Sequence, residues 1–303
     1  MNLPRLSSIT KKIFVALFGG FLLVFLLFHA SANLLILAND GGQAYSAFCH
    51  FMGTNLLIKV FEIGLLAIFA LHIIITLVLA IQNRKARGTQ RYHQPSKTKT
   101  AAGSKLAIWT GILILCFLVL HFCNFYFAKI GLVKGTYMVK VEEVVSNESI
   151  STVFQGMQYG MSPEEMVEAV SAQDPAQAED IKAAVDVVEY LNNPNIQENI
   201  VDKYLHKIPN DKKAAFKAAG IETEPDFYWM ARDLFTNPIY LIIYLVCFVV
   251  LWFHLRHAFE SCMQTLGLNN YKYNRAIEII GILLATVICL AFTITAVGVL
   301  VIA

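Results

Sequence analysis

Long apolar blocks alternate with polar segments along most of this 303-residue chain. Five of the blocks exceed the roughly 20 residues that a helix needs to cross the hydrocarbon layer of a membrane. They cover approximately residues 13–38, 57–82, 106–130, 238–263 and 276–302. None of them shows the two-residue alternation that is typical of barrel strands. The pattern therefore predicts an all-α integral membrane protein with five transmembrane helices.

A polar segment, residues 131–236, interrupts this pattern between the third and fourth blocks. It contains 18 acidic and 9 basic residues. The stretches 161–170, 177–191 and 211–220 are amphipathic and predict short helices, and Ser162 before a proline is typical of a helix start. We therefore expect a small helical insertion outside the membrane. Its lone histidine is expected at the surface.

The predicted organisation has three parts. They are residues 1–130 with transmembrane helices 1–3, residues 131–236 with the acidic helical insertion, and residues 237–303 with helices 4 and 5. The composition agrees with this, because hydrophobic residues make up 56% of the chain and charged residues only 15%. Nothing in the insertion resembles a nucleotide-binding motif, and we expect no nucleic-acid partner.

The basic residues are distributed unevenly between the polar segments. Residues 83–105 carry seven basic residues and no acid, and further basic residues lie near the N-terminus and between the last two blocks. With five crossings these three segments fall on one side, which the positive-inside rule makes cytoplasmic. The sequence thus predicts a multi-pass protein of the inner (cytoplasmic) membrane of a bacterium. Its N-terminus is cytoplasmic, and its insertion and C-terminus are periplasmic.

Four histidines lie inside apolar blocks, where an ionisable side chain is costly and usually functional. A helix rises 1.5 Å per residue, so the depth of each can be counted from the end of its block. His29 and His121 fall in the outer half of the membrane, whereas His72 and His254 fall in the inner half. This sorting predicts two pairs of imidazoles at two depths.

Paired imidazoles on facing helices are suitable axial ligands for haem iron. Zinc fits less well, because the sequence places no Cys, Asp or Glu with each pair. His257 is a rival to His254 on the same helix face, and we expect His257 and Arg256 to contact a haem propionate. An alternative stays open, in which each histidine is a hydrogen-bonded core residue of a haem-free transporter.

Five short motifs carry a family resemblance. They are FLLFHASANLL, GGQAYSAFCHFM, ALHIII, LVLHFCNF and FHLRHAFESCMQTLG. Together they resemble the single-subunit, dihaem cytochrome b membrane anchor of succinate:menaquinone reductases and quinol:fumarate reductases. The resemblance implies a four-helix haem-binding bundle, with His29 and His121 on the distal haem iron and His72 and His254 on the proximal one. The insertion has no counterpart in that family, and Ala258 stands where the family often has glycine.

The resemblance also implies partners and a function. A flavoprotein subunit and an iron–sulfur subunit would complete a succinate dehydrogenase/fumarate reductase, complex II of the respiratory chain and the tricarboxylic acid cycle. This chain would pass electrons between the iron–sulfur subunit and menaquinone through two b haems. It has no nucleophile or dinucleotide loop, so it would share in the quinone reaction only and have no activity alone. A higher oligomer within the lipid membrane stays open.

The quinone site is predicted near the outer haem from polar residues at that end of the blocks. The candidates are His50, Glu62, Asn33, Asn124 and Lys129. Each could equally contact a propionate or the membrane interface. A haem-b anchor of another oxidoreductase, of the formate dehydrogenase or hydrogenase type, is the alternative function closest to this one.

Overall fold

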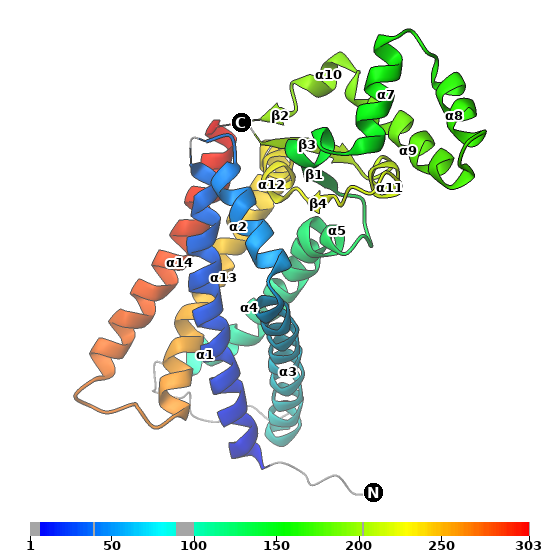
Figure 1. Ribbon diagram of the computed structural model, residues 1–303. Helices are drawn as coiled ribbons and strands as arrows, with labels where there is room; N and C mark the ends of the chain where they lie inside the picture. The colour runs from blue at the N-terminus through cyan, green and yellow to red at the C-terminus, as the bar shows by residue number, and fades with distance from the viewer. Residues whose placement is uncertain (1–6, 39, 89–99, 202, 303) are drawn as a thin grey trace, which may run out of the picture. The chain divides into compact units, whose positions relative to one another are not determined.

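The computed structural model describes residues 7–38, 40–88, 100–201 and 203–302 (Figure 1). The chain divides into two compact units. Unit 1 consists of residues 1–37, 51–119 and 235–303, and unit 2 consists of residues 38–50 and 120–234. Unit 2 therefore combines most of the loop after the first span with the predicted insertion. Residues 89–99, which belong to the predicted basic segment, lie outside the described part of the chain.

Within the described residues, five helical segments are long and apolar enough to cross a membrane. They are α1 (Ser8–Asn33) with the 3₁₀ turn η1 (Leu34–Leu37), α3 (Leu56–Arg87), α4 (Thr100–His121) with η2 (Phe122–Tyr126) and α5 (Phe127–Lys129), α13 (Pro238–Thr265) and α14 (Asn274–Ile302). The prediction of a mainly helical, multi-pass membrane protein is confirmed.

Polar side chains cap the starts of three of these spans. The Ser7 hydroxyl accepts a hydrogen bond from a backbone N–H in the first turn of α1, and Asn55 and Asn237 do the same for α3 and α13. Such caps satisfy N–H groups that have no partner inside the helix. Each span therefore begins where an apolar block meets a polar residue.

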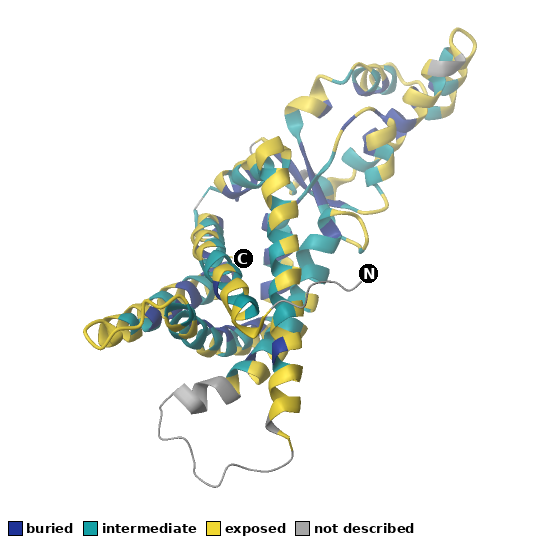
Figure 2. Ribbon diagram, turned by 90° about the horizontal axis from the view of Figure 1, so that it is seen from below, coloured by how far each residue is buried: buried dark blue, intermediate teal, exposed yellow. Residues whose placement is uncertain are grey.

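The spans keep large apolar side chains on their surface, as the exposed residues along the helices of unit 1 show in Figure 2. Leu57 is 78% exposed and Trp109 67% exposed. A surface this apolar is typical of contact with lipid. The interior of unit 1 is small by comparison, and small residues such as Ala30 and Ala285 let α1, α13 and α14 pack closely.

Three contacts place several helix ends of unit 1 at one end, here called the basic end. The Lys11 ammonium near the start of α1 donates to Gln82 near the end of α3, at 3.1 Å. The Cys262 thiol on α13 lies 3.3 Å from the carbonyl oxygen of Ala16 on α1. Arg256 on α13 pairs with Glu278 at the start of α14. The polar segments that carry the excess of basic residues are thus attached to the same end of unit 1.

Unit 2 contains a sheet and several short helices. Its elements are β1 (Thr136–Lys140), α6 (Val141–Val145), α7 (Glu148–Gln158), α8 (Pro163–Ser171), α9 (Pro175–Leu191), α10 (Pro194–Gln197), β2 (Ile200–Val201), β3 (Tyr204–Pro209), α11 (Lys213–Ala218) and β4 (Glu224–Pro225). α2 (Gln43–Thr54) and α12 (Phe227–Thr236) each begin in unit 2 and end in unit 1.

The three helices predicted from amphipathic stretches correspond to α8, α9 and α11. Ser162 caps α8 and exchanges two hydrogen bonds with Glu165, in the arrangement called a capping box. The antiparallel sheet, with strand order β2-β3-β1-β4, departs from the expectation of a purely helical insertion. Its strands have only two to six residues, which is too short for an alternating pattern to stand out.

The expectation of a surface position for His206 is wrong. His206 on β3 is fully buried, and its Nδ1 lies 3.0 Å from the carboxylate of Asp226, which is also fully buried. The same carboxylate accepts from the backbone N–H groups of Lys207 and Trp229. Asp226, 20 residues away along the chain, satisfies the Nδ1 of His206, whereas the buried Nε2 has no hydrogen-bond partner among the described residues.

Candidate haem site

His254 lies on α13 and faces Thr110 on α4. The Nδ1 of His254 is 3.2 Å from the Oγ1 of Thr110. The single proton of the Thr110 hydroxyl is directed to the backbone carbonyls of Leu106 and Ala107, at 3.2 and 3.1 Å. Thr110 Oγ1 therefore accepts the Nδ1–H of His254, which leaves the lone pair on Nε2 for a ligand. Metal-binding histidines are commonly oriented in this way.

His72 lies on α3 and faces the first half of α1. Its Nδ1 is buried and has no hydrogen-bond partner among the described residues, although the ring also interacts with the backbone of Val15 through a hydrogen bond. A buried imidazole nitrogen without a hydrogen-bond partner costs free energy unless a bound group satisfies it. The surroundings of His72 thus leave a donor atom free for a ligand.

Two glycines leave room beside these rings. A Cβ added to Gly19 on α1 would lie 3.4 Å from Cε1 of His72, and one added to Gly111 on α4 would lie 3.6 Å from Cε1 of His254. The two imidazoles themselves are within electrostatic reach of one another. The two histidines that were predicted to share the inner half of the membrane are thus close enough for their charges to interact.

His29 is held on α1 by its neighbours. Its ring stacks on Phe25, with centroids 5.4 Å apart, and meets Phe292 of α14 at 5.7 Å. The side-chain amide of Asn33 donates to the backbone oxygen of His29 at 2.8 Å and lies 3.4 Å from its Nε2. Asn33, a predicted quinone-site residue, thus lies directly beside a predicted haem ligand.

His121 ends α4 at the point where the third span changes to a π-helix, η2. π-helical turns are rare and are frequently found at functional sites. Asn124, another predicted quinone-site residue, lies within this turn, and the His121 ring contacts Phe125 at a centroid distance of 5.1 Å. His121 belongs to unit 2 and His29 to unit 1, so their pairing stays a prediction. Sequence reasoning missed the π-helix, for which the only signal is an asparagine in an apolar run.

Arg256 and His257 were predicted to contact a haem propionate. Arg256 is engaged by two carboxylates, Glu260 at 3.5 Å and Glu278 at 3.3 Å, and its guanidinium lies 5.8 Å from the Trp252 ring. A propionate would therefore have to share Arg256 with these acids. His257 is half-buried at the basic end.

The other three quinone-site candidates, His50, Lys129 and Glu62, contact different parts of the chain. His50, on α2, is bound to Glu224 of β4. Lys129 ends α5, with its ammonium 5.8 Å from the Tyr126 ring. Glu62 is half-buried on α3. Glu224, which no sequence pattern indicates, is thus a further polar residue beside the quinone-site candidate His50.

Within the described residues, no three His, Cys, Asp or Glu side chains gather closely enough to hold a metal ion. Structural zinc requires four such ligands, whereas a haem iron takes only two axial ones from the protein. The pair of His72 and His254, each with a nitrogen available and a glycine beside the ring, therefore fits an axial ligand pair of a haem.

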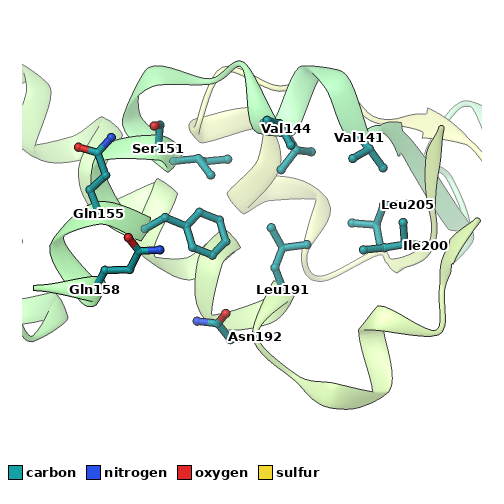
Figure 3. Close-up of a pocket in the computed structure, with 12 residues that line it drawn as sticks. Val141, Val144, Ser151, Gln155, Gln158, Leu191, Asn192, Ile200 and Leu205 are labelled. Carbon is teal, nitrogen blue, oxygen red and sulfur yellow. The ribbon is translucent and has the colours of Figure 1, made fainter. Parts of the chain in front are cut away.

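Unit 2 also has an apolar cavity of about 550 Å³ between α6, α7 and the end of α9 (Figure 3). Val144, Leu191 and Leu205 form part of its wall, and the amide side chains of Gln155 and Gln158 lie on one side. None of the residues that line it is charged or a histidine. The cavity therefore offers no ligand for iron, and none of the predicted site residues lines it.

Comparisons with protein-family models, with curated proteins and with solved structures gave no match for this chain. The functional conclusion therefore depends on the histidines and on the side chains that surround them.

Proposed function

We propose that this chain is the membrane-anchoring, dihaem cytochrome b subunit of a succinate dehydrogenase/fumarate reductase. In this role it passes electrons between an iron–sulfur subunit and menaquinone. The dicarboxylate reaction belongs to the flavoprotein subunit of the same complex. The proposed location is the inner membrane of a bacterium, with the basic end of unit 1 facing the cytoplasm.

This proposal rests on the arrangement of His254, Thr110 and His72. Two imidazoles lie within electrostatic reach on helices that are long enough to span a membrane. One of them has its Nδ1 satisfied by a hydroxyl, and the other has a buried nitrogen without a hydrogen-bond partner in the described part of the chain. A transporter core would be expected to satisfy both rings internally, because buried polar atoms are normally paired.

The proposed role of the residues follows from their surroundings. When bound, each haem supplies a one-electron couple whose potential depends on its ligands and on the polarity around it. His72 and His254 hold the inner haem, and His29 and His121 hold the outer one. Thr110 fixes the tautomer of His254, and Gly19 keeps α1 clear of His72. The aromatic rings beside His29 exclude water from it.

The distribution of charge supports the proposed orientation. The starts of α1 and α14 and the ends of α3 and α13 lie together at the basic end. Positively charged segments are retained on the cytoplasmic side of a membrane. The soluble subunits are proposed to dock there, next to the inner pair of histidines.

The test is to purify the full chain from cells that also express the proposed flavoprotein and iron–sulfur subunits. Haem is then counted by redox-difference absorption. We expect two low-spin b haems in the natural chain and one in His72→Ala and in His254→Ala. Cys116→Ala, a change of an exposed thiol on α4, is the matched control and should keep two.

Three results would overturn the proposal. A chain without haem favours the transporter alternative. Two unaltered haems in both histidine variants would show that these residues are not the ligands. If haem is present but the chain co-purifies with formate dehydrogenase or hydrogenase subunits, the anchor belongs to another oxidoreductase.

A further inference from the structure

The loop between α13 and α14, residues 266–273, joins two membrane-length helices of unit 1. Every residue from Leu266 to Arg275 is exposed, so the exposed surface continues into the first turn of α14. The exposed fraction is 55% for Leu268, 58% for Tyr273 and 97% for Tyr271. Large apolar and aromatic side chains that are exposed side by side mark contact with another surface.

The lengths of the two helices place this loop relative to a bilayer. α13 has 28 residues and α14 has 29, so each is about 42–44 Å long at 1.5 Å per residue. The hydrocarbon core of a bilayer is about 30 Å thick, and the bilayer with its headgroups about 40–45 Å. Both helices therefore extend through the headgroup layers. The loop at their shared end (Figure 1) lies at the level of the headgroups.

The loop has a defined conformation that depends on Asn270. The side-chain oxygen of Asn270 accepts a hydrogen bond from the backbone N–H of Lys272 at 3.1 Å. Its backbone oxygen accepts from the N–H groups of Tyr273 and Asn274, at 2.8 and 2.9 Å. A side chain that binds the backbone two residues further on is typical of a tight turn. The turn fixes the backbone from which Tyr271 and Lys272 project.

The charge of this surface is positive. Lys272 and Arg275 are its two basic residues, and the segment contains no acid before Glu278. Glu278 is paired with Arg256, and neither Lys272 nor Arg275 forms an ion pair within the described residues. Both cations are therefore available to an anion at the level of the headgroups.

We propose that this surface, residues 266–275, binds the headgroups of anionic phospholipids. Lys272 and Arg275 bind the phosphate diester, and the exposed tyrosines lie among the glycerol groups, where amphipathic rings are favoured. A lipid fits better than a soluble partner because both ends of the loop are fixed at headgroup level, where lipid surrounds it. The inference goes beyond the proposed function and does not depend on haem. In the proposed orientation the lipid belongs to the cytoplasmic leaflet.

The first experiment measures the binding of phosphatidylglycerol, labelled with a fluorophore on one acyl chain, to the purified full chain in dodecyl maltoside. We expect the double variant Lys272→Gln/Arg275→Gln to weaken binding about 30-fold, which is about fivefold for each basic residue. Labelled phosphatidylcholine, whose headgroup carries its own cation, should bind more weakly and equally to both proteins. Inorganic phosphate should not displace the labelled lipid.

The matched control is the double variant Arg84→Gln/Lys85→Gln. It removes two exposed basic residues from the end of α3, which lies at the same basic end. The charge of the chain falls by the same amount in both double variants. We expect the control to keep most of the affinity for phosphatidylglycerol.

The second experiment measures the depth of Tyr271 in the membrane. Tyr271→Trp adds an indole, whose emission in lipid nanodiscs is the increase over the natural chain. Phosphatidylcholine brominated near the glycerol end of its acyl chains should quench this added emission. Tyr159→Trp, at a position of unit 2 that is 86% exposed, is the control and should not be quenched, because unit 2 is predicted to lie outside the membrane. The measurement is repeated with the flavoprotein and iron–sulfur subunits bound.

Four outcomes would overturn the inference. They are unchanged binding of phosphatidylglycerol in Lys272→Gln/Arg275→Gln, equal losses in the two double variants, no quenching of Tyr271→Trp, and quenching that disappears when the soluble subunits bind. The last outcome would assign the loop to a protein interface. Haem content is a separate measurement, because a natural chain without haem would overturn the proposed function and leave lipid binding unaffected.

Discussion

The Nδ1 of His254 on α13 lies 3.2 Å from the Oγ1 of Thr110 on α4, although the two residues are 144 positions apart. The hydroxyl proton of Thr110 is used within its own helix, so the contact fixes the proton of His254 on Nδ1. A histidine fixed in this way presents Nε2 as a neutral ligand. Thr110 therefore connects the third span to the proposed haem site without itself being a ligand.

Replacement of Thr110 tests this contact. In Thr110→Val the side chain keeps its shape but cannot accept the Nδ1–H of His254, so the ring loses its fixed orientation. We expect haem affinity at this site to fall about 10-fold or more, in the range found when partners of metal ligands are removed. Haem titration of the purified chain measures it. Thr110→Ser keeps the hydroxyl and should bind as the natural chain does, and equal losses in the two variants would contradict the prediction.

The space beside His72 gives a second prediction. A leucine at Gly19 would extend beyond its Cβ, which already lies 3.4 Å from the ring of His72. Gly19→Leu should therefore remove one of the two haems. Gly64→Leu on α3, where nothing lies within 4 Å of an added Cβ, should remove neither. Absorption spectra of both variants check this, and an intact pair of haems in Gly19→Leu would show that His72 needs no such space.

The parts of the fold that depend on local sequence were predictable. A run of 20 apolar residues is itself the condition for a spanning helix, and the capping box at Ser162 and Glu165 is encoded within four residues. The contacts around the candidate site are different. Thr110 meets His254 and Glu224 meets His50 only after distant segments pack together. No local pattern carries that information.

The sheet and the buried His206 were missed for related reasons. β2 and β4 have two residues each, so they become strands only by pairing with longer neighbours. His206 is polar by type, and its burial depends on Asp226, which is contributed by another segment. The π-helix after His121 is also decided by packing, because its sequence FCNFY fits an ordinary helix equally well.

Cys49 gives a prediction on pH. Burial raises the pKa of its thiol to about 12, with Asp226 and Glu224 adding to the effect. The thiolate is the reactive form, so iodoacetamide at pH 8 should modify Cys49 at least about 100-fold more slowly than a free cysteine. Mass spectrometry of the folded and the denatured chain measures both rates, with Cys49→Ser as the background. Equal rates would contradict the burial of this thiol.

The same shift has a consequence for stability. In the unfolded chain the Cys49 thiol loses its proton at about pH 9, whereas in the folded protein it does so only near the raised pKa of about 12. The contribution of this group is therefore fully present below pH 9. It is lost as the pH rises from 9 towards 12, because ionisation then favours the unfolded state. Cys49→Ser should reduce this alkaline loss of stability.

Gly42 provides the last prediction, on the packing of the segment that leads into α2. Its φ of 90° is in the region that favours glycine, and an added Cβ would lie 2.5 Å from Cγ of Tyr228, a buried side chain. Gly131 has a similar φ of 78° but nothing within 4 Å of an added Cβ.

Gly131→Ala should therefore cost only the backbone penalty of about 1–2 kcal/mol. Gly42→Ala should cost about 1–3 kcal/mol more, because Tyr228 must move. Thermal unfolding in detergent compares the two variants, and equal losses would mean that Tyr228 does not pack on this turn.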